Sequence, residues 1–131
     1  MIFVDTSAWY ALYIPRDQDH ARSNEWRKTH TERLLTTDHV VVETLNLLTV
    51  RKEPDRAREL SRSLFAEAPA RLHRTTDADM RRAREVFERF TDKEWSFTDC
   101  VSYAVIERLG IKKAFAFDDH FRQFGIVEVV P

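Results

Sequence analysis

Four carboxylic acids stand at positions in this sequence where a carboxylate can take part in chemistry. They are Asp5, Glu43, Asp99 and Asp118. Four negative charges brought within a few ångströms repel one another, and protonation or a cation must relieve that repulsion. A hard divalent ion suits such a site, because Mg²⁺ and Mn²⁺ prefer oxygen ligands and also accept phosphate oxygens. The chemistry that this arrangement permits is hydrolysis of a phosphodiester by metal-activated water.

Two of these acids follow apolar runs, at residues 2–4 and 114–117. Neither run shows polar alternation, which is typical of strands buried on both faces of a parallel sheet. Ligands bind at the carboxyl ends of such strands, so we expect Asp5 and Asp118 to emerge from neighbouring strands into one crevice. Asp119 lies one residue further, and we expect it at a helix start rather than in the site.

Glu43 lies in a predicted helix that runs from residue 37 or 38 to about residue 51. This helix is apolar around most of its circumference, so we expect it to be largely buried. Glu43 shares a narrow polar stripe with His39 and Asn46. A carboxylate there is costly unless it is paired or bound to a cation. The sequence leaves open whether one of the 21 Lys and Arg residues or a metal ion supplies that charge.

Helix capping is the alternative role for two of the acids. Asp before a helix accepts a backbone N–H and stabilises the helix by ~1 kcal/mol, which is a sufficient role for Asp5. Ser96 followed three residues later by Asp99 matches a capping box. Asp99 also shares a partly apolar helix face with Ser102 and Tyr103, which indicates that this face turns inward. Both roles stay open for both acids.

Three other groups of polar residues have simpler interpretations. Asp77 and Asp79 fall in the predicted first turn of a helix, where acidic residues complement the helix dipole. The basic residues in segment 22–28 surround Trp26, and such a cluster can grip single-stranded nucleic acid. A solvated face with one core aromatic is the favoured interpretation of that segment. The five histidines show no zinc-site spacing, so we assign them surface or capping roles.

Length and composition predict one folded domain over residues 1–131. The hydrophobic content is 43%, which argues against disorder, and the net charge of −1 excludes nucleic-acid binding driven by total charge. The single Cys100 provides neither a disulfide nor a thiolate zinc site. The first residues lack the basic region of a signal peptide, and no apolar run is long enough to span a membrane. We therefore expect a cytoplasmic protein.

The predicted elements give an α/β fold class, a parallel sheet of about five short strands flanked by about seven helices. The strands are predicted at residues 2–4, 34–35, 71–74, 114–117 and 126–130. The helices are predicted near residues 9–13, 22–30, 37–51, 53–68, 77–90, 96–109 and 119–124.

With these residues in view, the sequence resembles the PIN-domain family, and most closely its small VapC-type toxin ribonucleases. The resemblance covers the whole chain and rests on four segments, which are Ile2-Phe3-Val4-Asp5-Thr6-Ser7, Val42-Glu43-Thr44, Phe97-Thr98-Asp99-Cys100-Val101-Ser102-Tyr103-Ala104 and Phe117-Asp118-Asp119-His120-Phe121. It implies that Asp5, Glu43, Asp99 and Asp118 bind Mg²⁺ or Mn²⁺, with Ser7 supporting them. It also implies cleavage of RNA, a homodimer, and inhibition by a small antitoxin.

We therefore expect a metal-dependent endoribonuclease, the toxin of a type II toxin–antitoxin pair, in which four acids hold the metal. Two other functions remain open: a PIN-domain nuclease of RNA maturation that has no antitoxin, and a non-catalytic interaction module. A haloacid-dehalogenase-type phosphatase would need a second acid two residues after Asp5, and Ser7 occupies that place.

Overall fold

Five parallel strands form one sheet in a computed structural model that describes all residues from 1 to 131. The strands are β1 (Ile2–Val4), β2 (Leu34–Thr37), β3 (Arg71–His73), β4 (Lys113–Phe115) and β5 (Glu128–Val130). The helices are α1 (Thr6–Tyr13), α2 (His20–Thr29), α3 (Asp38–Val50), α4 (Pro54–Phe65), α5 (Asp77–Arg89), α6 (Phe97–Leu109) and α7 (Asp119–Gln123). The predicted α/β class, with its parallel sheet and flanking helices, is confirmed.

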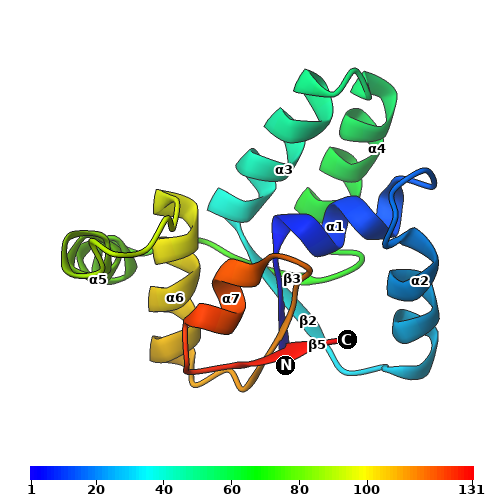
Figure 1. The fold of residues 1–131 in the computed structure, drawn as a ribbon. Helices are drawn as coiled ribbons and strands as arrows, with labels where there is room; N and C mark the ends of the chain where they lie inside the picture. Colours follow the sequence, from blue (N-terminus) through cyan, green and yellow to red (C-terminus); the bar gives the residue numbers. More distant parts are fainter.

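The helices lie on both sides of the sheet. Figure 1 shows α2 on one side, α5 and α6 on the other, and the α3–α4 pair projecting past the end of the sheet. Between these layers, Phe3, Trp9, Phe115 and Phe121 are fully buried. Phe121 holds the short α7 against the sheet, because its ring packs 5.9 Å from that of Phe3. No helix combines the length and apolar character that crossing a bilayer requires.

In the strand order β3-β2-β1-β4-β5, the direction in which successive strands are added changes at β1. From β1 the chain adds β2 and β3 on one side, and it later returns to add β4 and β5 on the other. Val4 in β1 is in register with Phe115 in β4, and the Asp5 N–H donates to the Phe115 carbonyl at 3.1 Å. Such a switch point between neighbouring parallel strands leaves a crevice at their carboxyl ends, where ligands bind.

The prediction that β4 continues to residue 117 is wrong, because the strand ends at Phe115. After it, the Ala116 N–H bonds to the Val130 carbonyl and the Phe117 N–H bonds to the Ser7 hydroxyl, so the ladder with β1 stops. Asp118 therefore stands beyond the strand end, separated from it by two residues, and caps α7. The two acids still follow adjacent strands.

The prediction that α3 is largely buried is also wrong. Four of its residues are buried, whereas Val42 is 56% exposed and Val50 is 78% exposed. The α3–α4 pair projects beyond the sheet, so no third layer covers the outer face of α3 (Figure 1). Apolar side chains are common on protein surfaces, so the apolar content of a helix does not by itself determine its burial.

Candidate active site

A hollow of ≈ 450 Å³ lies at the carboxyl ends of β1 and β4, and we call it the acid hollow. Its lining residues are Asp5, Thr6, Ser7, Tyr10, Asp17, Asp19, Glu43, Leu47, Arg51, Phe117 and Asp118. Three of the four predicted site acids are among them. The fourth, Asp99, is buried and is not among the lining residues, but it is close enough for its charge to raise the pKa of both Asp5 and Glu43. The structure therefore brings the four acids together.

Asp5 both caps a helix and belongs to the site. Its Oδ2 accepts hydrogen bonds from the Ser7 N–H at 3.3 Å and from the Ser7 hydroxyl at 2.9 Å, at the start of α1. The residue is 3% exposed, and this burial raises the pKa of its carboxyl to about 7. This pKa already includes a decrease from the Ser7 hydrogen bond and a smaller increase from the nearby charge of Asp99. Capping alone does not describe this environment.

Ser7 connects the segments that carry two of the acids. Its hydroxyl donates to Asp5 and accepts a hydrogen bond from the Phe117 N–H at 2.9 Å. One hydroxyl thus donates to the residue that follows β1 and accepts from the residue that precedes Asp118. This arrangement fits the supporting role that the family resemblance implies for Ser7.

Glu43 has no cationic partner, so the ion-pair alternative is not what the structure contains. None of the ion pairs in the molecule includes its carboxylate. Burial raises the pKa of Glu43, and the charges of Asp99 and Asp118 act in the same direction. Hydrogen bonding with Thr6 and Thr98 offsets part of the rise. The acid is half-buried, and the charged groups that act on it are other acids.

Asp99 forms the predicted capping box, with both hydrogen bonds between Ser96 and Asp99 at 3.0 Å. It also has a partner that the sequence did not predict. The Nδ1 atom of His120 lies 2.8 Å from Asp99 Oδ2 and 3.4 Å from Asp118 Oδ1. Burial lowers the pKa of His120, but these two acids and Asp5 outweigh it, so the pKa is raised. Our assignment of His120 to a surface or capping role was therefore wrong.

Asp118 and Asp119 occupy different environments. Asp118 is half-buried, lines the acid hollow, and accepts a hydrogen bond from the His120 N–H at 2.6 Å as the N-cap of α7. Asp119 is exposed and is the first residue of that helix. Asp118 can therefore contact a ligand in the acid hollow, whereas Asp119 is exposed to solvent.

The donor set suits a hard divalent ion in its chemistry, since it consists of carboxylate oxygens. The side chains are not arranged around a single point, however: no three Asp, Glu, His or Cys side chains are placed to hold a metal ion. Their oxygens are instead turned toward Ser7, His120 and the backbone at helix starts. Each carboxylate has lone pairs beyond those that its present partners use, so rotation about side-chain bonds is what ligation requires.

The other polar groups singled out in the sequence have structural roles. Asp79 is buried, forms a capping box with Thr76, and lies 2.6 Å from the Arg108 guanidinium. Burial raises the pKa of Asp79, but Arg108, Thr76 and His73 together hold it well below its usual range. Trp26 is buried and stacks 4.5 Å from His30, which confirms the core-aromatic interpretation.

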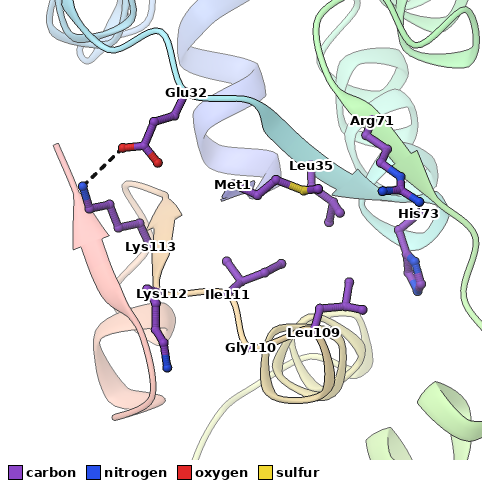
Figure 2. Close-up of a pocket in the computed structure, with 10 residues that line it drawn as sticks. All are labelled: Met1, Glu32, Leu35, Arg71, His73, Leu109, Gly110, Ile111, Lys112 and Lys113. Atoms are coloured by element: carbon purple, nitrogen blue, oxygen red, sulfur yellow. Dashed lines mark hydrogen bonds and ion pairs between the residues drawn. The ribbon is translucent and has the colours of Figure 1, made fainter.

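A second hollow, of ≈ 490 Å³, shows by contrast what the acid hollow contains. Its floor is apolar, with Leu35, Leu109 and Ile111 at the centre of Figure 2. Its one acid, Glu32, pairs with Lys113 at 3.4 Å (Figure 2). This hollow therefore offers no group of acids for metal-assisted chemistry.

Comparison with known proteins gives consistent matches. A model of the PIN domain matches residues 2–127. The chain is 35% identical over 131 residues to the 23S rRNA-specific endonuclease VapC20 of Mycobacterium tuberculosis, covering 100% of this chain and 99% of that protein. It is 30% identical over 128 residues to a VapC ribonuclease of Archaeoglobus fulgidus, covering 90% of this chain and 77% of that protein.

Solved structures agree with these matches. The crystal structure of M. tuberculosis VapC20, a toxin that cleaves the sarcin–ricin loop, superposes with a TM-score of 0.92 at 33% identity, covering all of both chains. FitAcB from Neisseria gonorrhoeae superposes with a TM-score of 0.74 at 14% identity, covering 100% of this chain and 97% of that one. The second likeness concerns the fold alone.

Proposed function

This chain belongs to the PIN-domain family, and from that premise we propose that it is a divalent-metal-dependent endoribonuclease. The observation that carries the proposal is the gathering of Asp5, Glu43, Asp99 and Asp118 at one switch point. None of the four forms an ion pair with a Lys or Arg side chain. Buried carboxylates without a cation are costly. Mg²⁺ or Mn²⁺ supplies the missing charge and supports hydrolysis of a phosphodiester bond.

The residues of the chain itself have distinct tasks in this proposal. The four carboxylates would hold the metal, which would supply an activated water and offset negative charge on the phosphate. Ser7 orients Asp5 through its hydroxyl and joins it to the backbone at Phe117. His120 orients Asp99 through a 2.8 Å contact.

We propose RNA as the substrate and a small antitoxin as the partner, because the relatives are ribonucleases named as VapC proteins. A cluster of carboxylates without a metal attracts a guanidinium in bidentate geometry, so we expect an Arg of the partner to contact the acids in the hollow. A homodimer and a cytoplasmic location complete the proposal. A PIN-domain nuclease of RNA maturation would have the same hollow, and co-purification with an antitoxin distinguishes the two.

The direct test is cleavage of RNA by the pure protein with Mg²⁺, with Mn²⁺, and with excess chelator. We expect cleavage with either metal and none with chelator. Asp5→Asn and Asp99→Asn should abolish cleavage while the proteins stay folded, since Asn retains the oxygen that capping requires. Asp55→Asn is the matched control, because Asp55 is fully exposed on α4. Undiminished cleavage in excess chelator would refute the proposal.

A further inference from the structure

The hollow drawn in Figure 2 combines an apolar floor with a basic rim, and we call it the basic hollow. It lies at the amino ends of β1 and β4, the opposite end of the sheet from the acid hollow, and has a volume of ≈ 490 Å³. Leu35 and Ile111 are buried in its floor, and Leu109 beside them is 42% exposed. The rim consists of Arg71, Lys112 and Lys113.

The cations of the rim exceed the acids of the basic hollow. Glu32 is the one acid in the lining, and it pairs with Lys113 at 3.4 Å. Arg71 and Lys112 are exposed and take part in none of the ion pairs in the molecule. Two positive charges therefore remain without a partner beside an apolar surface, which favours the binding of an anion.

His73, the remaining polar side chain of the lining, does not change this balance. Its Nε2 lies 2.8 Å from the Asp79 carboxylate, and the Arg108 guanidinium lies 2.6 Å from the same carboxylate. The negative charge of Asp79 is thus matched by Arg108 and does not offset the charge of Arg71. The basic hollow keeps its excess of positive charge.

The lining also indicates what the rest of the ligand is. It contains no Phe, Tyr or Trp side chain, whereas sites for unpaired bases present rings on which the bases stack. Its floor is aliphatic, and an aliphatic chain gains affinity by roughly fourfold for each methylene that such a surface covers. The volume of ≈ 490 Å³ is within the range of small-molecule sites. An aliphatic chain with an anionic end group therefore suits both the floor and the rim.

We propose that the basic hollow is a binding site for a small amphipathic anion, an aliphatic chain that ends in a phosphate or a carboxylate. The chain covers Leu35, Leu109 and Ile111, and the end group binds to Arg71 and Lys112. A phosphate should bind more tightly than a carboxylate, because it carries more negative charge. This site goes beyond the proposed ribonuclease function and does not depend on it.

The two glycines of the chain make a specific test possible. Gly110 lines the basic hollow and Gly125 does not. Full-length protein labelled with a nitrogen isotope in glycine gives one amide signal for each in a magnetic resonance spectrum, and carbonyl labelling of leucine identifies the signal that follows Leu109. The probe is octyl phosphate, added below the concentration at which it forms micelles. We expect the Gly110 signal to shift until the site is saturated and the Gly125 signal to stay in place.

Related probes test the end group and the chain separately. Octanol lacks the charge and inorganic phosphate lacks the chain, so each should bind at least roughly tenfold more weakly than octyl phosphate. Hexyl phosphate, which is shorter by two methylenes, should also bind roughly tenfold more weakly. Octanoate should shift the same signal, and its affinity relative to octyl phosphate identifies the preferred end group.

Matched variants assign the binding to the rim and to the floor. Arg71→Gln combined with Lys112→Gln should weaken octyl phosphate binding roughly tenfold at low salt. Lys28→Gln combined with Arg84→Gln removes the same charges from exposed positions outside the hollow and should leave the affinity unchanged. Leu109→Gln should weaken binding of octyl phosphate and leave that of inorganic phosphate unchanged, because it alters only the floor.

Several results would overturn the proposal. One is a Gly110 signal that octyl phosphate leaves in place, and another is a rim variant that binds like its control. Equal binding of octanol or of inorganic phosphate also overturns it, because one half of the site would then be unused. A Gly110 signal that shifts with protein concentration alone would show that a second copy covers the hollow. A signal that shifts with an acidic leucine-containing peptide but with neither octyl probe would show that a protein segment binds there instead.

Discussion

Replacing Asp5 with asparagine should stabilise the metal-free protein at neutral and alkaline pH. Asp5 is 3% exposed, and burial raises the pKa of its carboxyl from 3.8 to about 7. Asparagine has nearly the same shape, retains an oxygen that accepts the Ser7 hydrogen bonds, and carries no charge at any pH. The substitution therefore removes the ionisation and keeps the cap.

The magnitude follows from the two pKa values. Between pH 3.8 and about 7 the folded state holds a proton on Asp5 that the unfolded state has released. The free energy of unfolding of the parent therefore falls with rising pH, by ~1.4 kcal/mol per pH unit. Over this interval the loss amounts to about 4 kcal/mol, and it is complete once the pH exceeds the folded-state pKa. The variant has no such loss.

The assay is denaturation by urea in the presence of chelator, followed by tryptophan fluorescence from about pH 4 to about pH 8. We expect the variant and parent to have similar stability at the acidic end. The variant should be more stable by up to about 4 kcal/mol at the alkaline end. Adding Mg²⁺ should then stabilise the parent more than the variant, because a ligand of the folded state stabilises it by mass action.

Two results would contradict this reasoning. A stability difference that does not change with pH would show that the Asp5 carboxyl titrates normally. A variant that is less stable than the parent at pH 8 would show that the charged form of Asp5 stabilises the fold. Asp55→Asn, at a fully exposed position, is the control and should show no such pH-dependent gain.

Three further predictions concern the other acids and the partner. Asp118→Asn should lower metal affinity and cleavage. Asp119→Asn should cost at most a few tenths of a kcal/mol in stability, since Asp119 is exposed and loses only the interaction of its charge with the start of α7. Calorimetry and cleavage assays on both variants check this, and an inactive Asp119 variant beside an active Asp118 variant would reverse the assignment. Asp79→Asn should lower the free energy of unfolding by roughly 2 kcal/mol, because it weakens the hydrogen bonds to Arg108 and His73, and it should leave metal affinity unchanged. Those partners depress the pKa of Asp79, so the difference in stability between parent and variant should shrink as the pH falls. Co-expression with a neighbouring antitoxin gene should yield a complex in which substitution of one antitoxin Arg weakens binding; absence of any complex would favour the RNA-maturation alternative.

Local sequence patterns predicted the strands well where burial is complete. The unbroken apolar run at residues 2–4 is typical of a central strand or a buried helix, and it is too short for a helix. All three residues are fully buried in the structure. The end of β4 was less predictable. Ala116 and Phe117 are apolar, but their N–H groups bond to Val130 and Ser7, and no composition rule contains those partners.

Residues whose role depends on distant contacts were hardest to predict. His120 meets Asp99 across 21 positions of sequence, and no spacing rule for metal-binding or catalytic histidines covers that pair. Its place two residues after Asp118 was the available signal. Val42 and Val50 illustrate the same limit for burial, since their exposure depends on how far α3 extends past the sheet.

The anchoring of α7 by Phe121 makes the core part of the machinery for positioning acids. A helix of five residues is too short to persist by itself, so α7 depends on its packing. Phe121 provides that packing through Phe3 and through Phe124, whose ring centroid lies 4.6 Å from its own. Asp118 and His120 are therefore placed by a side chain that faces away from solvent. A substitution in the hydrophobic interior can therefore abolish activity while every polar residue of the site is intact. A related sequence that keeps all the site residues but has lost this packing would be wrongly classified as active.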